Sequence, residues 1–144
     1  MNKILFSALL VLCMAACKKE DVAEPPATKI TEPTVEEQII GLWYSTGTVT
    51  NIYHNGVFFN TAKEPDEEVT FQFYTDNTFI AKAPGYPDVN GTWGYDKING
   101  NFIFEMTPFR IDTLTDSTFV FVNSSDKTIN NTVVTKEVIV SLKK

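Results

Sequence analysis

Several short segments of this sequence place apolar and polar side chains at alternate positions. In Val69–Phe73 the first, third and fifth residues are apolar, and Phe102–Met106 follows a similar pattern. Successive side chains of a β-strand point to opposite faces, so this period predicts strands with one buried face and one wet face. Asn55-Gly56 and Asn99-Gly100 lie between apolar runs and supply the positive φ that two-residue hairpin turns require. These features constrain the chain to an all-β fold.

The apolar runs divide the chain into expected strands joined by short turns. Sequential short strands favour an antiparallel up-and-down meander, and closing about eight of them into a small barrel removes the free edges that invite aggregation. A short N-terminal helical turn is expected within Thr34–Leu42. A barrel of this size holds its own side chains or one small ligand. The expected strands are residues 42–53, 57–62, 67–74, 78–83, 91–96, 101–106, 109–114, 117–123 and 132–142.

The first residues have the order of a secretory signal. Lys3 gives a positive start, the apolar run Ile4–Leu12 follows, and small residues precede Cys17. The run is much shorter than the roughly 20 residues that a membrane-spanning helix needs. Residues 1–16 are therefore expected to be a signal peptide, and the chain is expected to be exported.

The end of this signal resembles that of bacterial lipoproteins. In that family, small residues directly precede a cysteine that is lipidated and becomes the new N-terminus, and Met14-Ala15-Ala16-Cys17 fits except that Met14 stands where Leu is more common. The resemblance implies lipidation of Cys17 and an outer-membrane anchor, since several acyl chains bind a membrane stably. An ordinary cleaved signal ending near a cysteine is the alternative. Cys13 and Cys17 lack the partners of a metal site, and none is expected.

Residues 17–35 are expected to form a disordered tether, and residues 36–144 the single folded domain. The tether is rich in charge and proline, with few large apolar side chains to bury. Lys19-Glu20-Asp21 is similar to the lysine-plus-acid tag with which one group of Gram-negative bacteria sends lipoproteins to the cell surface. A solvated tether without an address is the alternative.

Charge excludes one class of partner. The chain carries a formal net charge of −6 at pH 7. Removal of residues 1–16 would make the chain more acidic, because it takes away the positive charge of Lys3. An acidic domain without a basic stripe repels phosphate backbones, so nucleic acid is not an expected partner.

The domain also resembles lipocalins and the lipocalin-like domains of bacterial lipoproteins. Gly41-Leu42-Trp43 matches their Gly-x-Trp signature, and Phe73–Phe79 and Gly91–Tyr95 resemble a middle hairpin and the strand after it. The resemblance implies that Trp43 packs at the closed end of the barrel. In the family an Arg from a late strand covers this Trp, which suggests Arg110, although Arg110 precedes the last two strands.

Catalytic patterns are missing from the sequence. No Gly-x-Ser-x-Gly elbow, phosphate loop or His-Glu-x-x-His occurs, and His54 beside Asn55-Gly56 is expected to be a solvated turn residue. The acidic residues Glu64, Asp66, Glu67 and Glu68 lack the spacing of a calcium loop and are expected to be a solvated connection. The chain is not expected to be an enzyme or to hold a cofactor.

Two triplets resemble acceptor sites for O-linked glycans in the same group of bacteria. They are Asp112-Thr113-Leu114 and Asp116-Ser117-Thr118, with Thr113 and Ser117 as the acceptors. The favoured alternative is that Asp and Thr occupy a tight turn, where their side chains cap the backbone.

Two functions of different class remain. The lipocalin resemblance implies that the barrel binds a small apolar or amphipathic ligand. The alternative is a structural or protein-interaction lipoprotein whose barrel is filled by its own side chains and whose loops contact a neighbouring envelope protein. The aromatic residues expected to line the open mouth are Tyr53, Phe58, Phe59, Tyr86, Phe109 and Phe119.

Overall fold

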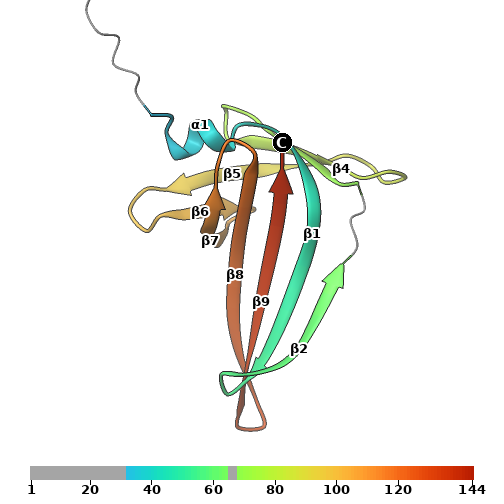
Figure 1. Ribbon diagram of the computed structural model, residues 1–144, viewed down its shortest axis with the longest axis vertical. Coiled ribbons are helices and arrows are strands. Elements are labelled where there is room, and N and C mark those ends of the chain that lie inside the picture. Colours follow the sequence, from blue (N-terminus) through green and yellow to red (C-terminus); the bar gives the residue numbers. More distant parts are fainter. Residues whose placement is uncertain (1–31, 65–67) are drawn as a thin grey trace, which may run out of the picture. The chain divides into compact units, whose positions relative to one another are not determined.

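The computed structural model describes residues 32–64 and 68–144, which form one short helix and nine strands (Figure 1). The all-β fold and every expected strand are confirmed, although several ends differ. The helix α1 spans Val35–Ile39. The strands are β1 (Gly41–His54), β2 (Val57–Glu64), β3 (Thr70–Phe73), β4 (Thr78–Lys82), β5 (Val89–Asp96), β6 (Asn101–Phe104), β7 (Thr107–Leu114), β8 (Thr118–Ile129) and β9 (Thr132–Lys143).

Eight of the nine strands in the described part of the chain close into an antiparallel barrel. The order runs from β1 through β3 to β9, and β1 also pairs with β9, which closes the wall. β2 is an additional strand, because the first part of β1, Gly41–Tyr44, pairs directly with β3. The expected antiparallel barrel of about eight strands is therefore confirmed, and β2 is the one strand of the described chain that lies outside its wall.

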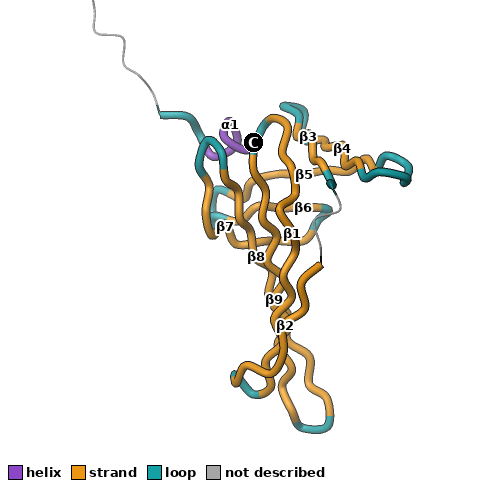
Figure 2. The backbone as a smooth tube through the Cα atoms, turned by 45° about the vertical axis from the view of Figure 1, so that its right-hand side comes forward, coloured by secondary structure: helices purple, strands orange, loops and turns teal. Residues whose placement is uncertain are grey.

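The additional strand belongs to a sheet that projects from the barrel, which we call the extension (Figures 1 and 2). Residues Thr48–His54 of β1 pair with β2 on one side and with β9 on the other. The second half of β8, residues 123–129, pairs with the first half of β9. The extension therefore contains four strands in the order β2, β1, β9, β8, and every residue of β2 is exposed.

β1 changes partner at a bulge. The register of β1 against β9 shifts between Ser45 and Gly47, and Gly47 has a φ of 121°, in the region that favours glycine. The Ser45 amide still donates to the Val69 carbonyl, at 2.8 Å, immediately before β3 begins. The part of β1 before the bulge therefore belongs to the barrel wall, and the part after it belongs to the extension.

The helix is fixed at one end of the barrel by a capping box. The Glu37 amide donates to Thr34 Oγ1 at 3.3 Å, and the Thr34 amide donates to Glu37 Oε2 at 2.7 Å. Glu36 also forms an ion pair with Lys97, with 2.8 Å between Oε1 and Nζ. The helix ends at Ile39, so the expected helical turn is confirmed over part of its range while Leu42 already lies in β1.

Alternate residues of the barrel strands point inward and fill much of the interior. Trp43, Phe73, Phe102 and Phe119 have no exposed surface, and Phe102 lies 5.0 Å from Phe119 between ring centroids. No polar or charged residue of the described part is fully buried. The buried cluster consists of Ile39, Trp43, Phe73, Phe79, Trp93, Phe102, Phe119, Phe121 and Leu142.

Candidate functional site in the open half of the barrel

The half of the barrel next to α1 contains fully buried aromatic side chains, and we call it the closed end. Trp43 lies here, and its Nε1–H donates to the Ile39 carbonyl at 2.6 Å. The Phe119 ring lies 5.7 Å from the Trp43 ring between centroids. Trp93 satisfies its own N–H by donating to the Tyr74 carbonyl at 3.1 Å. Buried aromatic side chains with satisfied polar atoms indicate a structural core rather than a binding site.

The cation that covers Trp43 is Lys144, not Arg110. Lys144 Nζ lies 4.5 Å from the centre of the Trp43 ring and donates to the Gln38 carbonyl at 3.0 Å. Arg110 lies in β7 with its side chain mostly exposed, 3.6 Å from an oxygen of Asp112. Arg110 follows the inward-facing Phe109 and therefore points away from the interior. The expected pairing of Arg110 with Trp43 is wrong.

The other half of the barrel holds a cavity of about 200 Å³, which we call the inner cavity. The residues that line it are mainly aromatic and aliphatic, and four of these residues are phenylalanines. An engineered apolar cavity of about 150 Å³ in another protein stays dry and binds benzene, so this volume is sufficient for a small apolar group. The residues that line the inner cavity are Ser45, Thr48, Val69, Phe71, Phe104, Phe109, Phe121, Val138 and Val140.

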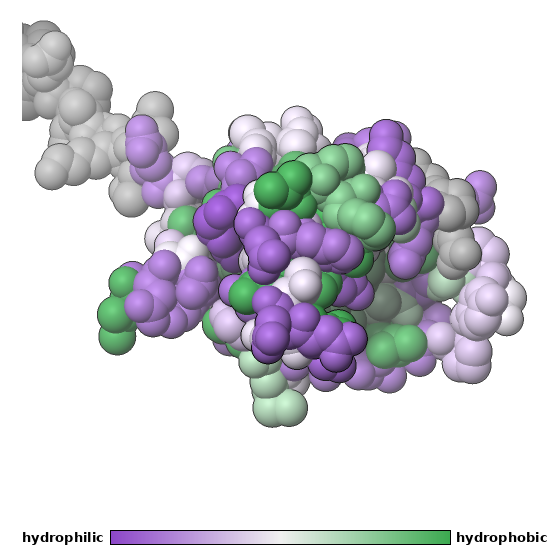
Figure 3. Space-filling view, turned by 90° about the horizontal axis from the view of Figure 1, so that it is seen from below, coloured by the Kyte–Doolittle hydropathy of each residue, from purple (hydrophilic) through white to green (hydrophobic). Residues whose placement is uncertain are grey.

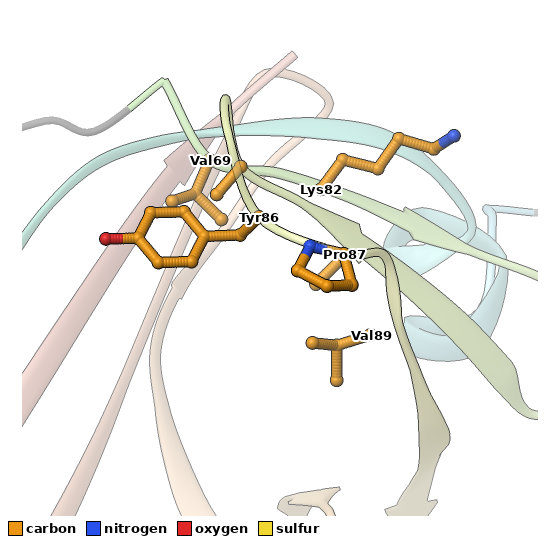
Figure 4. Close-up of a pocket in the computed structure, with 7 residues that line it drawn as sticks. Val69, Lys82, Tyr86, Pro87 and Val89 are labelled. Atoms are coloured by element: carbon orange, nitrogen blue, oxygen red, sulfur yellow. The ribbon is translucent and has the colours of Figure 1, made fainter.

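A second hollow of about 280 Å³, the outer cavity, lies under the loop between β4 and β5. Figure 4 shows the Tyr86 ring beside Val69, with Pro87 and Val89 on the other side of the hollow. Figure 3, seen from below the view of Figure 1, shows apolar surface within a hollow among hydrophilic side chains. The residues that line the outer cavity are Val69, Ala81, Lys82, Ala83, Tyr86, Pro87 and Val89.

Few polar groups face the two cavities. In the inner cavity, Ser45 and Thr48 are the residues with hydroxyl groups, and Ser45 Oγ accepts a hydrogen bond from the Gly47 amide at 3.2 Å. In the outer cavity the charged residue is Lys82, whose Nζ lies 2.9 Å from Asp88 Oδ2. The Asp88 carboxylate raises the pKa of Lys82 by hydrogen bonding and charge. The cavities therefore suit an uncharged apolar group with at most a small polar end.

A third hollow, of about 480 Å³, lies on the outside of the barrel wall. It is lined by Tyr44, Ser45, Glu68, Thr70 and Lys143. Tyr44, Thr70 and Lys143 each neighbour an inward-facing residue along their strand, so they point outward. This surface hollow has a more polar lining than the inner cavity.

The aromatic residues expected at the mouth lie in four different places. Phe109 lines the inner cavity and Tyr86 lines the outer cavity. Phe119 is wrong as a mouth residue, because it is fully buried against Trp43 at the closed end.

The remaining three lie on the extension. Phe58 packs against Tyr53 with ring centroids 5.9 Å apart, and Phe59 stacks on His54 at 4.1 Å. The Tyr53 hydroxyl donates to Glu137 Oε2 at 3.3 Å. The pKa of Tyr53 is raised, mainly because its hydroxyl is partly desolvated and secondly because the Glu137 charge lies nearby. Their assignment to the mouth is therefore wrong, because β2 leaves the barrel wall.

The sequence interpretation missed three phenylalanines of the inner cavity, Phe71, Phe104 and Phe121. The alternation of side chains along the strands could have identified them, because residues two apart face the same side of a strand. Phe71 lies two residues before Phe73, Phe104 two after Phe102, and Phe121 two after Phe119. Phe71, Phe104 and Phe121 therefore line the same interior as their partners, one layer nearer the mouth.

The described residues contain few features of catalysis. Among residues 32–64 and 68–144, no three His, Cys, Asp or Glu side chains come together as a metal-binding group. His54 ends β1 and stacks on Phe59, so it is part of the extension sheet rather than a fully solvated turn residue. The expectation that His54 is only a solvated turn residue needs this correction.

The two residues predicted as glycan acceptors differ in their surroundings. Thr113 lies half-buried in β7 at a register shift against β8, whereas Ser117 is exposed in the turn before β8. The hydroxyl that caps this turn belongs to Thr115, which accepts from the Thr118 amide at 3.0 Å. Modification of Thr113 or Ser117 stays a prediction.

Several expectations fall outside the described residues. The signal peptide, Cys17, most of the tether and Lys19-Glu20-Asp21 precede residue 32, and Asp66 and Glu67 lie in the undescribed gap. Within the described ranges, the structure contains no helix of the length and hydrophobicity that crossing a membrane requires. No protein family, no curated protein and no solved structure matches this chain.

Proposed function

We propose that this domain is a non-enzymatic binding protein that holds a small apolar or amphipathic molecule in the open half of its barrel. The inner cavity carries this proposal. Its volume of about 200 Å³ and its phenylalanine walls lie within a barrel whose opposite half is tightly packed. A fold that only needed a filled core would gain stability from closing such a space, because apolar cavities cost free energy.

Equilibrium binding of a neutral apolar probe tests the proposal. We expect octanol to bind the purified domain, measured by titration calorimetry, and Val138→Phe to weaken that binding because the larger ring occupies the inner cavity. Val133→Phe is the matched control, since Val133 lies on the extension and is partly exposed. Circular dichroism would establish that both variants fold. Equal octanol affinity in Val138→Phe and wild type would contradict the proposal.

We further infer that the mature chain is a lipoprotein anchored in the outer membrane through Cys17. The support is the order of charged, apolar and small residues before Cys17 and the tether-like composition after it. Mass spectrometry of the exported protein should find acyl chains on residue 17, and Cys17→Ser should release the protein from the membrane fraction. Protease treatment of intact cells would distinguish surface display from an inward-facing anchor.

A protein-interaction role is the second candidate, and the extension favours it. Val57, Phe58 and Phe59 expose 70%, 55% and 65% of their surface on the edge strand β2. Exposed apolar side chains on a free strand edge are features of protein contact sites. A photoreactive phenylalanine analogue at position 58 should cross-link to a neighbouring envelope protein in the native host if this role holds, and Phe58→Ser should abolish co-purification of that protein.

A further inference from the structure

We propose that Val69 separates the two cavities and sets the length of the ligand that the barrel accepts. This inference rests on the proposed function, because it concerns the ligand of the same site. It also assigns a chemical class to that ligand, namely uncharged, straight-chain amphiphiles.

Val69 holds a fixed place between the cavities. It lines both, and among the described lining residues it is the only one that they share. The Val69 carbonyl accepts the Ser45 amide at 2.8 Å, which ties this residue to β1 just before β3 begins. Phe71 and Phe73 face the interior, so the alternation along the chain also points the Val69 side chain inward.

The dimensions of the cavities favour a narrow, flexible ligand. Each space is small, at about 200 Å³ and about 280 Å³, so a rigid fused-ring molecule of greater volume fits neither alone. A molecule that occupies both must pass beside one valine side chain. A straight alkyl chain fits the space up to this valine best, because it is narrow along its whole length and adjusts by rotation about single bonds.

The walls favour a neutral ligand with a hydroxyl end. The inner cavity is lined by no charged residue within the described chain, and Ser45 and Thr48 offer hydroxyl groups on one side of it. An ionised carboxylate there would lose its hydration without gaining a cation. Lys82 in the outer cavity does not change this conclusion, since its ammonium is engaged by Asp88.

A chain-length series tests the role of Val69. We would measure the affinity of straight-chain alcohols from butanol to decanol for the wild-type domain and for Val69→Ala by titration calorimetry. Each methylene that enters an apolar cavity should tighten binding roughly fourfold. We expect the wild-type affinity to stop rising once the chain reaches Val69, and Val69→Ala to move that limit to longer alcohols.

Matched variants separate this effect from a simple gain of volume. Val138 lines the inner cavity but not the outer cavity, and Val89 lines the outer cavity but not the inner cavity. Val138→Ala and Val89→Ala remove the same two methyl groups and should leave the barrier between the cavities in place. Val69→Leu adds bulk at the partition and should move the limit to shorter alcohols, which gives a second reading if Val69→Ala folds poorly.

The outcomes distinguish the two levels of the proposal. Failure of every alcohol to bind wild-type protein would overturn the proposed function and the partition with it. Binding with the same length limit in wild type, Val69→Ala and Val69→Leu would overturn the partition alone. Octanoate that binds as tightly as octanol would overturn the assignment to uncharged ligands.

Discussion

The two ends of the barrel use the same kind of side chain for different purposes. At the closed end, Phe73, Phe102 and Phe119 are fully buried, and Phe119 packs against Trp43. At the open end, Phe71 and Phe104 are only partly buried and line the inner cavity. Strand alternation carries both sets into one interior, so packing density, not residue type, separates the fully buried half from the half that holds the inner cavity.

Removing a phenylalanine from each end should give the largest difference. Phe119→Ala deletes a fully buried ring and should lower the free energy of unfolding by about 3–5 kcal/mol. Phe109→Ala deletes a partly exposed ring beside an existing cavity and should cost roughly 1–2 kcal/mol while weakening octanol binding. Denaturant titration measures both losses. Equal losses would show that the closed end has no special role in stability.

An added methyl group should test how tightly the middle of the barrel is packed. A Cβ atom at Gly91 would lie 2.5 Å from the Phe79 ring and also meet the Glu105 side chain. Gly91→Ala should therefore destabilise the domain by about 1–3 kcal/mol, detected as a lower melting temperature. Gly94→Ala is the matched control, because the nearest atom to its Cβ, in the Asn77 side chain, is 3.9 Å away. A Gly91→Ala variant with unchanged stability would contradict close packing here.

The covering of Trp43 by Lys144 should contribute less. Lys144→Met keeps most of the aliphatic stem but removes the ammonium that lies over Trp43 and donates to the Gln38 carbonyl. We expect a loss of about 1–2 kcal/mol in denaturant titration. Lys143→Met removes the same charge from the outward face and should be nearly neutral. Identical effects of the two substitutions would exclude a specific role for the Lys144 contact.

The smallest expected effect concerns the ion pair at the closed end. The pKa of Glu36 is lowered, and the largest cause is its hydrogen bond with Lys97. The same hydrogen bond is the largest cause of the raised pKa of Lys97. A lowered carboxyl pKa adds stability above the ordinary carboxyl range, and this stability is lost as pH falls through the lowered value. The raised Lys97 pKa adds stability that is lost as pH rises through it.

A pH series of thermal unfolding for wild type and Lys97→Met measures this contribution. The wild type should be slightly more stable between about pH 5 and pH 10, and the difference should shrink at both extremes. The pair is mostly solvent-exposed at Lys97, so the difference should also decrease in high salt. A difference that grows as pH falls would have the wrong sign for this ion pair.

Sequence periodicity predicted the barrel but not its division. Phe71, Phe73, Phe102 and Phe104 alternate with other residues, and alternation reports which face is buried. It does not report how completely that face is packed, because packing depends on strands far apart in the sequence. The inner cavity therefore needed the structure.

The extension was missed for a different reason. Residues Ser124–Thr128 are polar and give no apolar alternation, so β8 was expected to end at residue 123. Pairing with β9 continues it to Ile129, since the backbone bonds of a ladder do not require apolar side chains. Tyr53, Phe58 and Phe59 were placed at the mouth because the departure of β2 from the barrel was not visible in local pattern.

Closure of the barrel by β1 and β9 has a consequence for the time course of folding. The two strands lie near opposite ends of the described chain, and Thr48 pairs with Val140. Joining them requires the whole intervening chain to be brought into a loop, which costs conformational entropy before the pairing energy is gained. Proteins dominated by such distant contacts fold in milliseconds to seconds rather than microseconds. Until β1 pairs with β9, a folding chain therefore leaves the edges of both strands unpaired and open to contact with neighbouring chains.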